Sequence, residues 1–244
     1  MRRCSSLVIA CCARCCSART RSRCAASRSR ALRRSESRVS AAPDQARLAA
    51  IRRCRHWIFD LDGTLTHPVH DFDALRRELG VPDRIPILEH LASLPVARAE
   101  PLRRRLDAIE TAACDRAMPR PGAATLLAWL RRSGSRVGIV SRNSHASVCR
   151  TLVAAGLGGE FDPSDLLGRD EAEPKPSPAG IQRLLDSWGA AADDAVMVGD
   201  FLFDLQAGRA AGVATVYLDW DGDGRWAGEA DLVLPGLTWL PPSA

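Results

Sequence analysis

The alternation of short apolar segments with helical ones constrains the fold of this chain more than any other feature. From residue 56 onward, five short and largely apolar runs have the character of strands, at 56–59, 136–140, 195–198, 214–218 and 231–234. Helical segments separate most of them, at about 123–132, 144–155, 178–188 and 202–211. This pattern predicts an α/β fold, a Rossmann-like parallel sheet with helices on both faces.

Residues 68–118 break the alternation. They are helical in pattern at about 71–79 and 98–117, with a proline-rich stretch at 82–95 between these two segments. A turn at 119–122 closes the segment. We therefore expect a small helical insert over the sheet. The sequence contains no run of about 18 apolar residues, so it offers no ordinary transmembrane helix.

The first 42 residues differ in composition from the rest. They hold 11 arginines, a single acid and six of the nine cysteines, whereas the remainder is acidic overall despite the chain's formal charge of +5. This composition predicts a disordered tail. Four interpretations of the tail stay open: half a metal site at Cys12 and Cys15, a secretory or lipoprotein signal, an organelle transit peptide, or an extension from a mis-assigned start. The basic tail is also no argument that the folded part binds nucleic acid.

Polar residues stand where the predicted strands end. Asp60 to Thr64 follow the first strand, Ser141 to Asn143 the second, and Asp200 the third, with Asp204 four residues on. Lys175, the one lysine of the chain, precedes the helix at 178–188. In an open parallel sheet, ligands bind beyond the carboxyl ends of the strands, so we expect these side chains to converge.

The residue types indicate phosphoryl transfer. Several converging carboxylates repel one another unless a cation neutralises them, and Mg²⁺ is the natural ion for oxygen ligands. A serine hydroxyl and a lysine ammonium bind phosphate better than they bind Mg²⁺. Carboxylates, metal, hydroxyl and lysine together describe a site for phosphoryl groups.

Each position also has an ordinary structural interpretation. Asp60 and Asp62 suit a surface turn, Ser141 suits a helix cap, and Asp204 suits the first turn of a helix. Lys175 could be a solvated surface residue.

Taken in order, these residues resemble the four motifs of the haloacid dehalogenase (HAD) superfamily, in particular its phosphoglycolate phosphatase-like members. Asp-Leu-Asp-Gly-Thr at 60–64 resembles the first motif, Ser141 the second, Lys175 the third, and Gly-Asp at 199–200 with Asp204 the fourth. The resemblance covers about residues 56–218. It implies a catalytic core formed by 52–67 and 119–240, with the helical insert 68–118 as a cap that closes over the site.

The resemblance also implies roles for individual residues. Asp60 would be the nucleophile and Asp62 the general acid and base. Mg²⁺ would bind the Asp60 side chain, the Asp62 backbone carbonyl and Asp200, and Asp204 would act through water or by orienting Lys175. Ser141 and Lys175 would hold the phosphoryl oxygens. The candidate phosphate-binding set also includes Gly63, where the chain turns sharply, Arg142 and Asn143.

The sequence thus predicts a Mg²⁺-dependent phosphatase that hydrolyses small phosphate monoesters through an aspartyl-phosphate intermediate. The alternatives are a phosphomutase of the same fold, and a non-catalytic module that binds nucleic acid or acidic surfaces through the basic tail. The expected partner is a small phosphorylated metabolite, without a specific nucleic acid or a membrane, for a monomer or homodimer. Cys54, Cys114 and Cys149 are scattered, which suits free thiols in a reducing cytoplasm.

Overall fold

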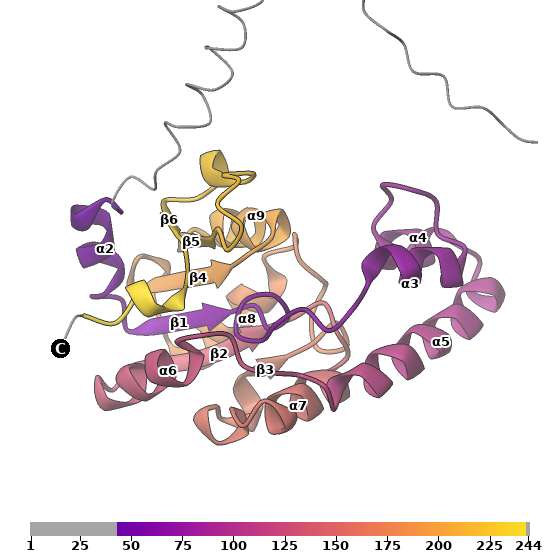
Figure 1. Cartoon of the computed structure of the whole chain (residues 1–244), viewed down its shortest axis with the longest axis horizontal. Coiled ribbons are helices and arrows are strands. Elements are labelled where there is room, and N and C mark those ends of the chain that lie inside the picture. The colour runs from indigo at the N-terminus through magenta and orange to yellow at the C-terminus, as the bar shows by residue number, and fades with distance from the viewer. Residues whose placement is uncertain (1–42, 243–244) are drawn as a thin grey trace, which may run out of the picture. The chain divides into compact units, whose positions relative to one another are not determined.

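The computed structural model describes residues 43–242, and the predictions for residues 1–42 lie outside this range. Six parallel strands form one sheet in the order β3-β2-β1-β4-β5-β6 (Figure 1). The strands are β1 (His56–Phe59), β2 (Arg136–Val140), β3 (Leu166–Leu167), β4 (Ala195–Gly199), β5 (Ala214–Leu218) and β6 (Leu232–Leu234). The predicted α/β class and parallel sheet are confirmed.

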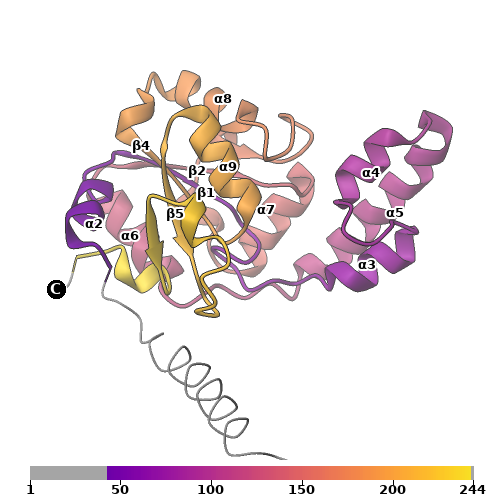
Figure 2. The same cartoon turned by 90° about the horizontal axis from the view of Figure 1, so that it is seen from above.

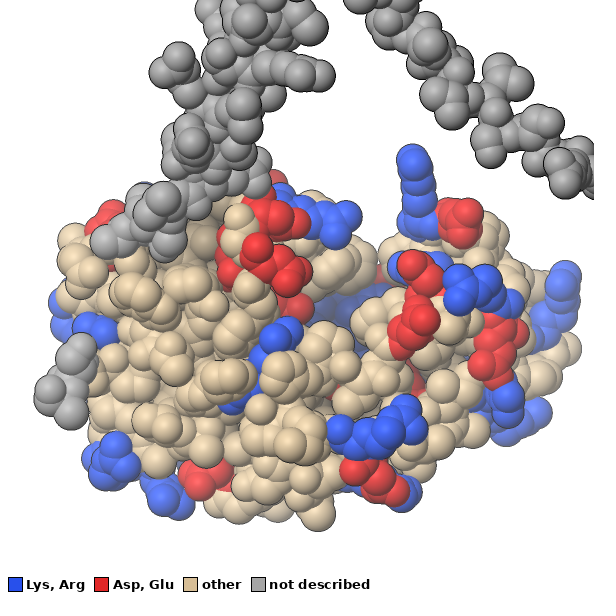
Figure 3. Space-filling view, in the orientation of Figure 1, with Lys and Arg blue, Asp and Glu red and all other residues tan. Residues whose placement is uncertain are grey.

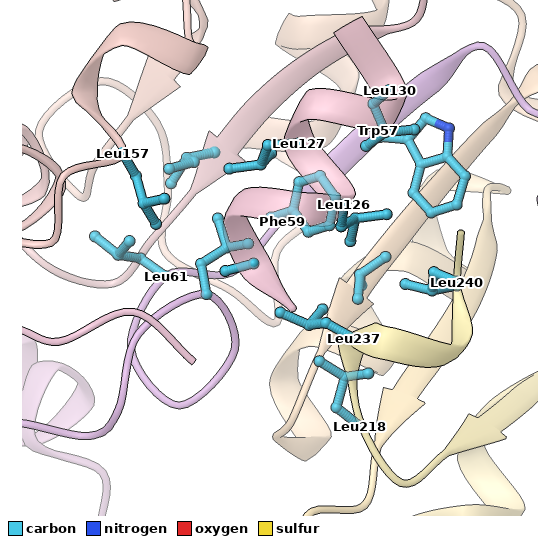
Figure 4. Packing of buried hydrophobic residues seen from close by; sticks show 14 of the residues in the cluster. Trp57, Phe59, Leu61, Leu126, Leu127, Leu130, Leu157, Leu218, Leu237 and Leu240 are labelled. Carbon is cyan, nitrogen blue, oxygen red and sulfur yellow. The ribbon is translucent and has the colours of Figure 1, made fainter. Parts of the chain in front are cut away.

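Helices cover both faces of the sheet. Side chains alternate along β1, so Trp57 and Phe59 point to one face and Ile58 to the other. The first face packs against α2 (Gln45–Ile51), α6 (Ala123–Arg132) and α7 (His145–Ala154), and Figure 4 shows Leu126, Leu127 and Leu130 of α6 beside Phe59 and Trp57. The second face packs against α8 (Ala179–Trp188) and α9 (Leu202–Ala211).

Two elements of the sheet domain differ from the sequence prediction. The strand β3 was not predicted, since two residues are too few for a recognisable pattern. The helix α2 was not predicted either, although Leu48 and Ile51 lie in the main core. At the start of α8, Pro178 is the cap residue, and the Ser177 hydroxyl accepts a hydrogen bond from the backbone N–H of Ala179 at 3.3 Å.

The insert forms three helices with an apolar core of their own. The helices α3 (Phe72–Leu79), α4 (Ile87–Ser93) and α5 (Val96–Cys114) lie together in Figure 2. Their shared core contains Leu75, Leu79, Val81, Leu91 and Leu106. The helix α4 lies in the stretch 82–95, where the prolines indicate a connection between two helices. Pro86 and Pro95 precede α4 and α5 as their cap residues, so prolines mark helix starts here.

Within the described residues, no helix has both the length and the apolar character needed to cross a bilayer.

Candidate active site

Lys175 is buried between two carboxylates. Its side chain is 1% exposed, and its ammonium lies 2.6 Å from Asp60 Oδ1 and 2.7 Å from Asp204 Oδ1. Burial alone would lower the pKa of Lys175, but Asp204 and Asp60 outweigh this effect, so its pKa is raised and the ammonium stays charged. The interpretation of Lys175 as a solvated lysine is therefore wrong.

Three carboxylates gather around this ammonium. Asp60, Asp200 and Asp204 each offer an oxygen, and these oxygens lie within 4.8 Å of one another. Burial raises the pKa of Asp60 well above its ordinary value, and burial together with Asp204 raises the pKa of Asp200 to about 7. Burial and mutual repulsion both disfavour the ionised forms of these acids, and their oxygens are close enough together to bind a single metal ion.

The sheet brings the first and fourth motifs together. The central strands β1 and β4 are neighbours, with Phe59 opposite Val198, and the backbone N–H of Asp60 donates to the Val198 carbonyl at 3.0 Å. Gly63 has a φ of +91°, and a Cβ atom there would overlap the Asp200 carboxylate. The turn after β1 thus requires glycine both for its backbone conformation and for its approach to Asp200.

Asp204 uses both of its oxygens within the site. One oxygen pairs with Lys175, and the other accepts a hydrogen bond from the Phe201 backbone N–H at 3.0 Å. The side chain is 3% exposed. Asp204 thus lies in the first turn of α9, as the structural interpretation expected, and it also pairs with Lys175.

Ser141 lies at the end of β2 and is buried. Its hydroxyl accepts a hydrogen bond from the Asn143 backbone N–H at 3.2 Å. The helix α7 begins at His145, and its N-cap is Ser144, whose side chain accepts from the Ser147 N–H. Ser141 is therefore not the cap of this helix.

Asp62 has partners that differ from those of the carboxylate cluster. The Asn143 side-chain amide donates to Asp62 Oδ2, and the Thr66 hydroxyl lies 3.4 Å from Oδ1. Burial raises the pKa of Asp62, while His70 and Asn143 oppose this shift. The two aspartates of the first motif thus occupy distinct environments, with only Asp60 in contact with Lys175.

Several contacts around the site were not predicted. The Thr64 hydroxyl donates to Asp200 Oδ1 at 2.7 Å. Arg142 donates to the Lys175 carbonyl and forms two hydrogen bonds, of 2.9 and 2.7 Å, with Glu89 of α4. The Arg142 guanidinium also lies over the Phe203 ring, 4.7 Å from its centroid. Thr64 belongs to the Asp-Leu-Asp-Gly-Thr motif at 60–64, so its place near the site could have been predicted. Glu89 is 53 residues from Arg142, and no local sequence pattern predicts that contact.

A second arginine links the insert to the sheet domain. Arg169, in the loop after β3, forms hydrogen bonds of 3.0 and 2.9 Å with the Glu110 carboxylate and also pairs with Asp107, both on α5. In Figure 3, a hollow separates the helices of the insert from the rest of this face, and basic side chains are visible inside it.

The pKa of Glu110 leads to a prediction for stability. Burial raises it from 4.5 to about 7, against the opposing effects of Arg169 and the Ser144 backbone N–H; Asp107 raises it further. The folded state therefore binds a proton more tightly than the unfolded state. The resulting stabilisation is complete below about pH 4.5 and is lost as the pH rises through about 7. Glu110→Gln should remove this loss, which amounts to about 3 kcal/mol.

Denaturant unfolding of both proteins at pH 5 and pH 8 checks this prediction. As the pH rises from 5 to 8, we expect the free energy of unfolding of Glu110→Gln to increase relative to that of the native protein. Taking the difference cancels the other carboxyl groups, which titrate in both proteins. A constant difference at the two pH values would contradict the prediction.

Comparisons with known proteins place this arrangement in a family. Residues 88–212 match the model of the haloacid dehalogenase-like hydrolases. A phosphoglycolate phosphatase of Rhodospirillum rubrum is 36% identical over 191 residues, covering 67% of this chain and 78% of the relative. A phosphoglycolate phosphatase of Pseudomonas syringae pv. syringae is 30% identical, covering 67% of this chain and 68% of the relative.

A solved structure shows the same fold. The crystal structure of a hydrolase from Pseudomonas syringae superposes with a TM-score of 0.64 and 23% identity, covering 76% of this chain and 95% of that one. The chain belongs to the haloacid dehalogenase-like hydrolases. Within this family it is similar to phosphoglycolate phosphatases.

Proposed function

We propose that this hydrolase is a Mg²⁺-dependent phosphatase of small phosphate monoesters that works through an aspartyl-phosphate on Asp60. The observation that carries the proposal is the position of Lys175, which is buried between Asp60 and Asp204 beside the third carboxylate, Asp200. A lysine and a set of acids in this arrangement offer a nucleophile, a cation site and a positive charge for phosphate.

The donor set fits Mg²⁺. The clustered atoms are carboxylate oxygens, which are the ligands that this ion prefers. Asp60 and Asp200 would hold the ion, together with the backbone carbonyl of Asp62. Asp204 would mainly orient Lys175, since both of its oxygens already have partners. When bound, Mg²⁺ supplies charge neutralisation for the carboxylates and the transferring phosphoryl group.

In the first half of the reaction, the Asp60 carboxylate attacks phosphorus and forms an acyl phosphate. Asp62 donates a proton to the oxygen of the leaving alcohol as the P–O bond breaks. In the second half, Asp62 takes a proton from water, which attacks the phosphorus and releases Asp60 and inorganic phosphate. The raised pKa of Asp62 fits a group that has to carry a proton in the first step.

Binding of the phosphoryl group falls to Ser141 and Lys175 in this proposal. Ser141 lies at the end of β2, next to the central strand β1 that leads to Asp60. Arg142 and Asn143 already have protein partners, namely Glu89 and Asp62. We therefore assign Asn143 to the orientation of Asp62 and Arg142 to the contact between cap and core. Gly63 provides the turn after β1 and leaves room for the Asp200 carboxylate beside it.

We further propose that residues 68–118 act as the cap and that residues 52–67 and 119–240 form the catalytic core. The separate apolar core of the insert supports this division, and α2 adds residues 45–51 to the core. The substrate would be a small phosphorylated metabolite that enters between cap and core. Cys54, Cys114 and Cys149 are free thiols, which suits a reducing cytoplasm.

Hydrolysis of p-nitrophenyl phosphate by the purified protein tests the proposed function. We expect activity with Mg²⁺ and loss of activity on addition of EDTA, with recovery when excess Mg²⁺ is restored. Inorganic phosphate should appear in step with nitrophenol, whereas a phosphomutase would retain the phosphoryl group or pass it to a sugar phosphate. Activity that survives EDTA would refute the metal dependence, and a lack of hydrolysis across a panel of phosphorylated metabolites would refute the phosphatase.

A further inference from the structure

Arg169 is nearly buried at a junction between the cap and the loop at 141–143. Its side chain is 12% exposed and Glu110 is 6% exposed. The same guanidinium nitrogen that contacts Glu110 also donates to the backbone carbonyl of Arg142 at 3.0 Å. The other terminal nitrogen pairs with Asp107, one turn away from Glu110 on α5. One side chain therefore holds two cap acids and one carbonyl of the loop.

The backbone beside Arg169 holds the same loop. The Arg169 N–H donates to the Asn143 carbonyl at 2.8 Å. A Cβ atom on Gly168 would lie 2.6 Å from the Asn143 carbonyl oxygen, so the two segments approach closely there. The Asn143 amide in turn donates to the carboxylate of Asp62. A continuous series of hydrogen bonds thus runs from α5 through Arg169 and Asn143 to Asp62.

The geometry suits arginine in particular. A planar guanidinium can donate in several fixed directions at once, whereas a lysine ammonium is a compact point charge. A second ion pair between α5 and the sheet domain gives a useful contrast. Arg150 of α7 pairs with Asp115 at the end of α5, but these side chains are 48% and 62% exposed. Exposed pairs of this kind contribute little, so Arg150 serves as a matched control.

We propose that Arg169 is a positioning residue that ties cap helix α5 to the 141–143 loop and thereby holds the Asn143 amide against Asp62. The inference rests on the proposed function, because the orientation of Asp62 matters only if this residue transfers protons. A small displacement of a reacting group can reduce a rate about 100-fold. Loss of Arg169 should therefore act on the chemical step more than on substrate binding.

The first test compares Arg169→Met with Arg150→Met. We expect kcat to fall about 10- to 100-fold in Arg169→Met with KM changed less than about threefold. Arg169→Lys should lie between this variant and the native protein, and Arg150→Met should keep kcat within about twofold. A kcat of Arg169→Met within twofold of Arg150→Met would overturn the proposal.

Methionine at position 169 leaves Glu110 buried without its cation, which can prevent folding. Each Arg169 variant is therefore also made with Glu110→Gln and compared with Glu110→Gln alone. A fall in kcat that persists in this background supports the positioning role. If the fall in kcat disappears once Glu110→Gln has removed the buried charge, Arg169 has a role in stability alone, and the proposal is overturned.

A double-mutant cycle tests the route through Asn143. If Arg169 acts by holding this side chain, Arg169→Met and Asn143→Ala should not add, and the double variant should resemble the slower single variant. Additive losses in kcat would show that Arg169 does not act through Asn143.

Amide hydrogen exchange separates this inference from the proposed function. We expect exchange at residues 141–145 to quicken at least about tenfold in Arg169→Met but not in Arg150→Met, because only the first loses a side-chain hydrogen bond to this loop, the one to the Arg142 carbonyl. Absence of phosphatase activity in the native protein would refute the function and leave this readout intact. Equal exchange in the two variants would refute the positioning role even in an active phosphatase.

Discussion

Asp60→Asn is expected to abolish phosphatase activity, with a loss in kcat on the order of 10⁴-fold or more. An amide of the same shape keeps the space filled but is a far weaker nucleophile than a carboxylate, so the acyl phosphate cannot form at a useful rate. The change gives up the ion pair with Lys175, which keeps Asp204 as its partner, but it also relieves repulsion with Asp200 and Asp204. We therefore expect the variant to stay folded. Steady-state kinetics and thermal unfolding check the two parts.

Asp219→Asn is the matched control, since Asp219 follows β5 as Asp60 follows β1. Its carboxylate accepts a hydrogen bond from the Gly224 backbone N–H at 3.0 Å, and Asp219 lies outside the cluster of Asp60, Asp200 and Asp204. Its activity should stay within about threefold of the native value. Mass spectrometry after acid quenching should find phosphate on the peptide that contains residue 60 in the native protein and in Asp219→Asn, but not in Asp60→Asn. Hydrolysis at the native rate by Asp60→Asn would rule out this nucleophile.

Lys175→Met is expected to reduce both stability and activity. The substitution leaves Asp60 and Asp204 buried without the ammonium that contacts both, and breaking a buried pair in this way costs about 3–5 kcal/mol. The loss of positive charge should also lower kcat on the order of 10²–10³-fold, as for other groups that stabilise transition-state charge. Urea unfolding and steady-state kinetics measure the two effects.

Arg183→Met on α8 provides the comparison, because Arg183 is exposed and its one side-chain hydrogen bond among the described residues goes to the Glu171 carbonyl. Its stability should stay within about 0.5 kcal/mol of the native protein. If Lys175→Met unfolds at the same urea concentration as the native protein, the buried pairs contribute far less to stability than their geometry implies. If it also turns over at the native rate, Lys175 has no part in the reaction.

The sequence predicted the sheet and the convergence of its polar ends because these features follow from local patterns. A central strand such as 56–59 is apolar on both faces, so its sequence alone marks it as buried, and the residue after it must lie at the edge where ligands bind. The two-residue strand β3 has no such pattern. The helix α4 was missed since prolines at 86 and 95 suggest a connection, although each directly precedes a helix start.

The partners of charged side chains were the main features that the sequence could not provide. The sequence allows two roles for Asp204, and only its distance to Lys175 shows which contacts it makes. Arg169 and its partner Asp107 are 62 residues apart, and no periodicity links them. Such pairs depend on how the inserted helices pack against the sheet domain, which short-range sequence patterns do not encode.

The independent apolar core of α3, α4 and α5 has a consequence for how this protein can diverge. Its residues Leu75, Leu79, Val81, Leu91 and Leu106 pack among themselves. Substitutions on the faces of these three helices that lie away from Arg142 and Arg169 can accumulate without disturbing the packing beneath Asp60. Under the proposed role of these helices as a cap, the chemistry and the choice of substrate can thus evolve at different rates within one gene.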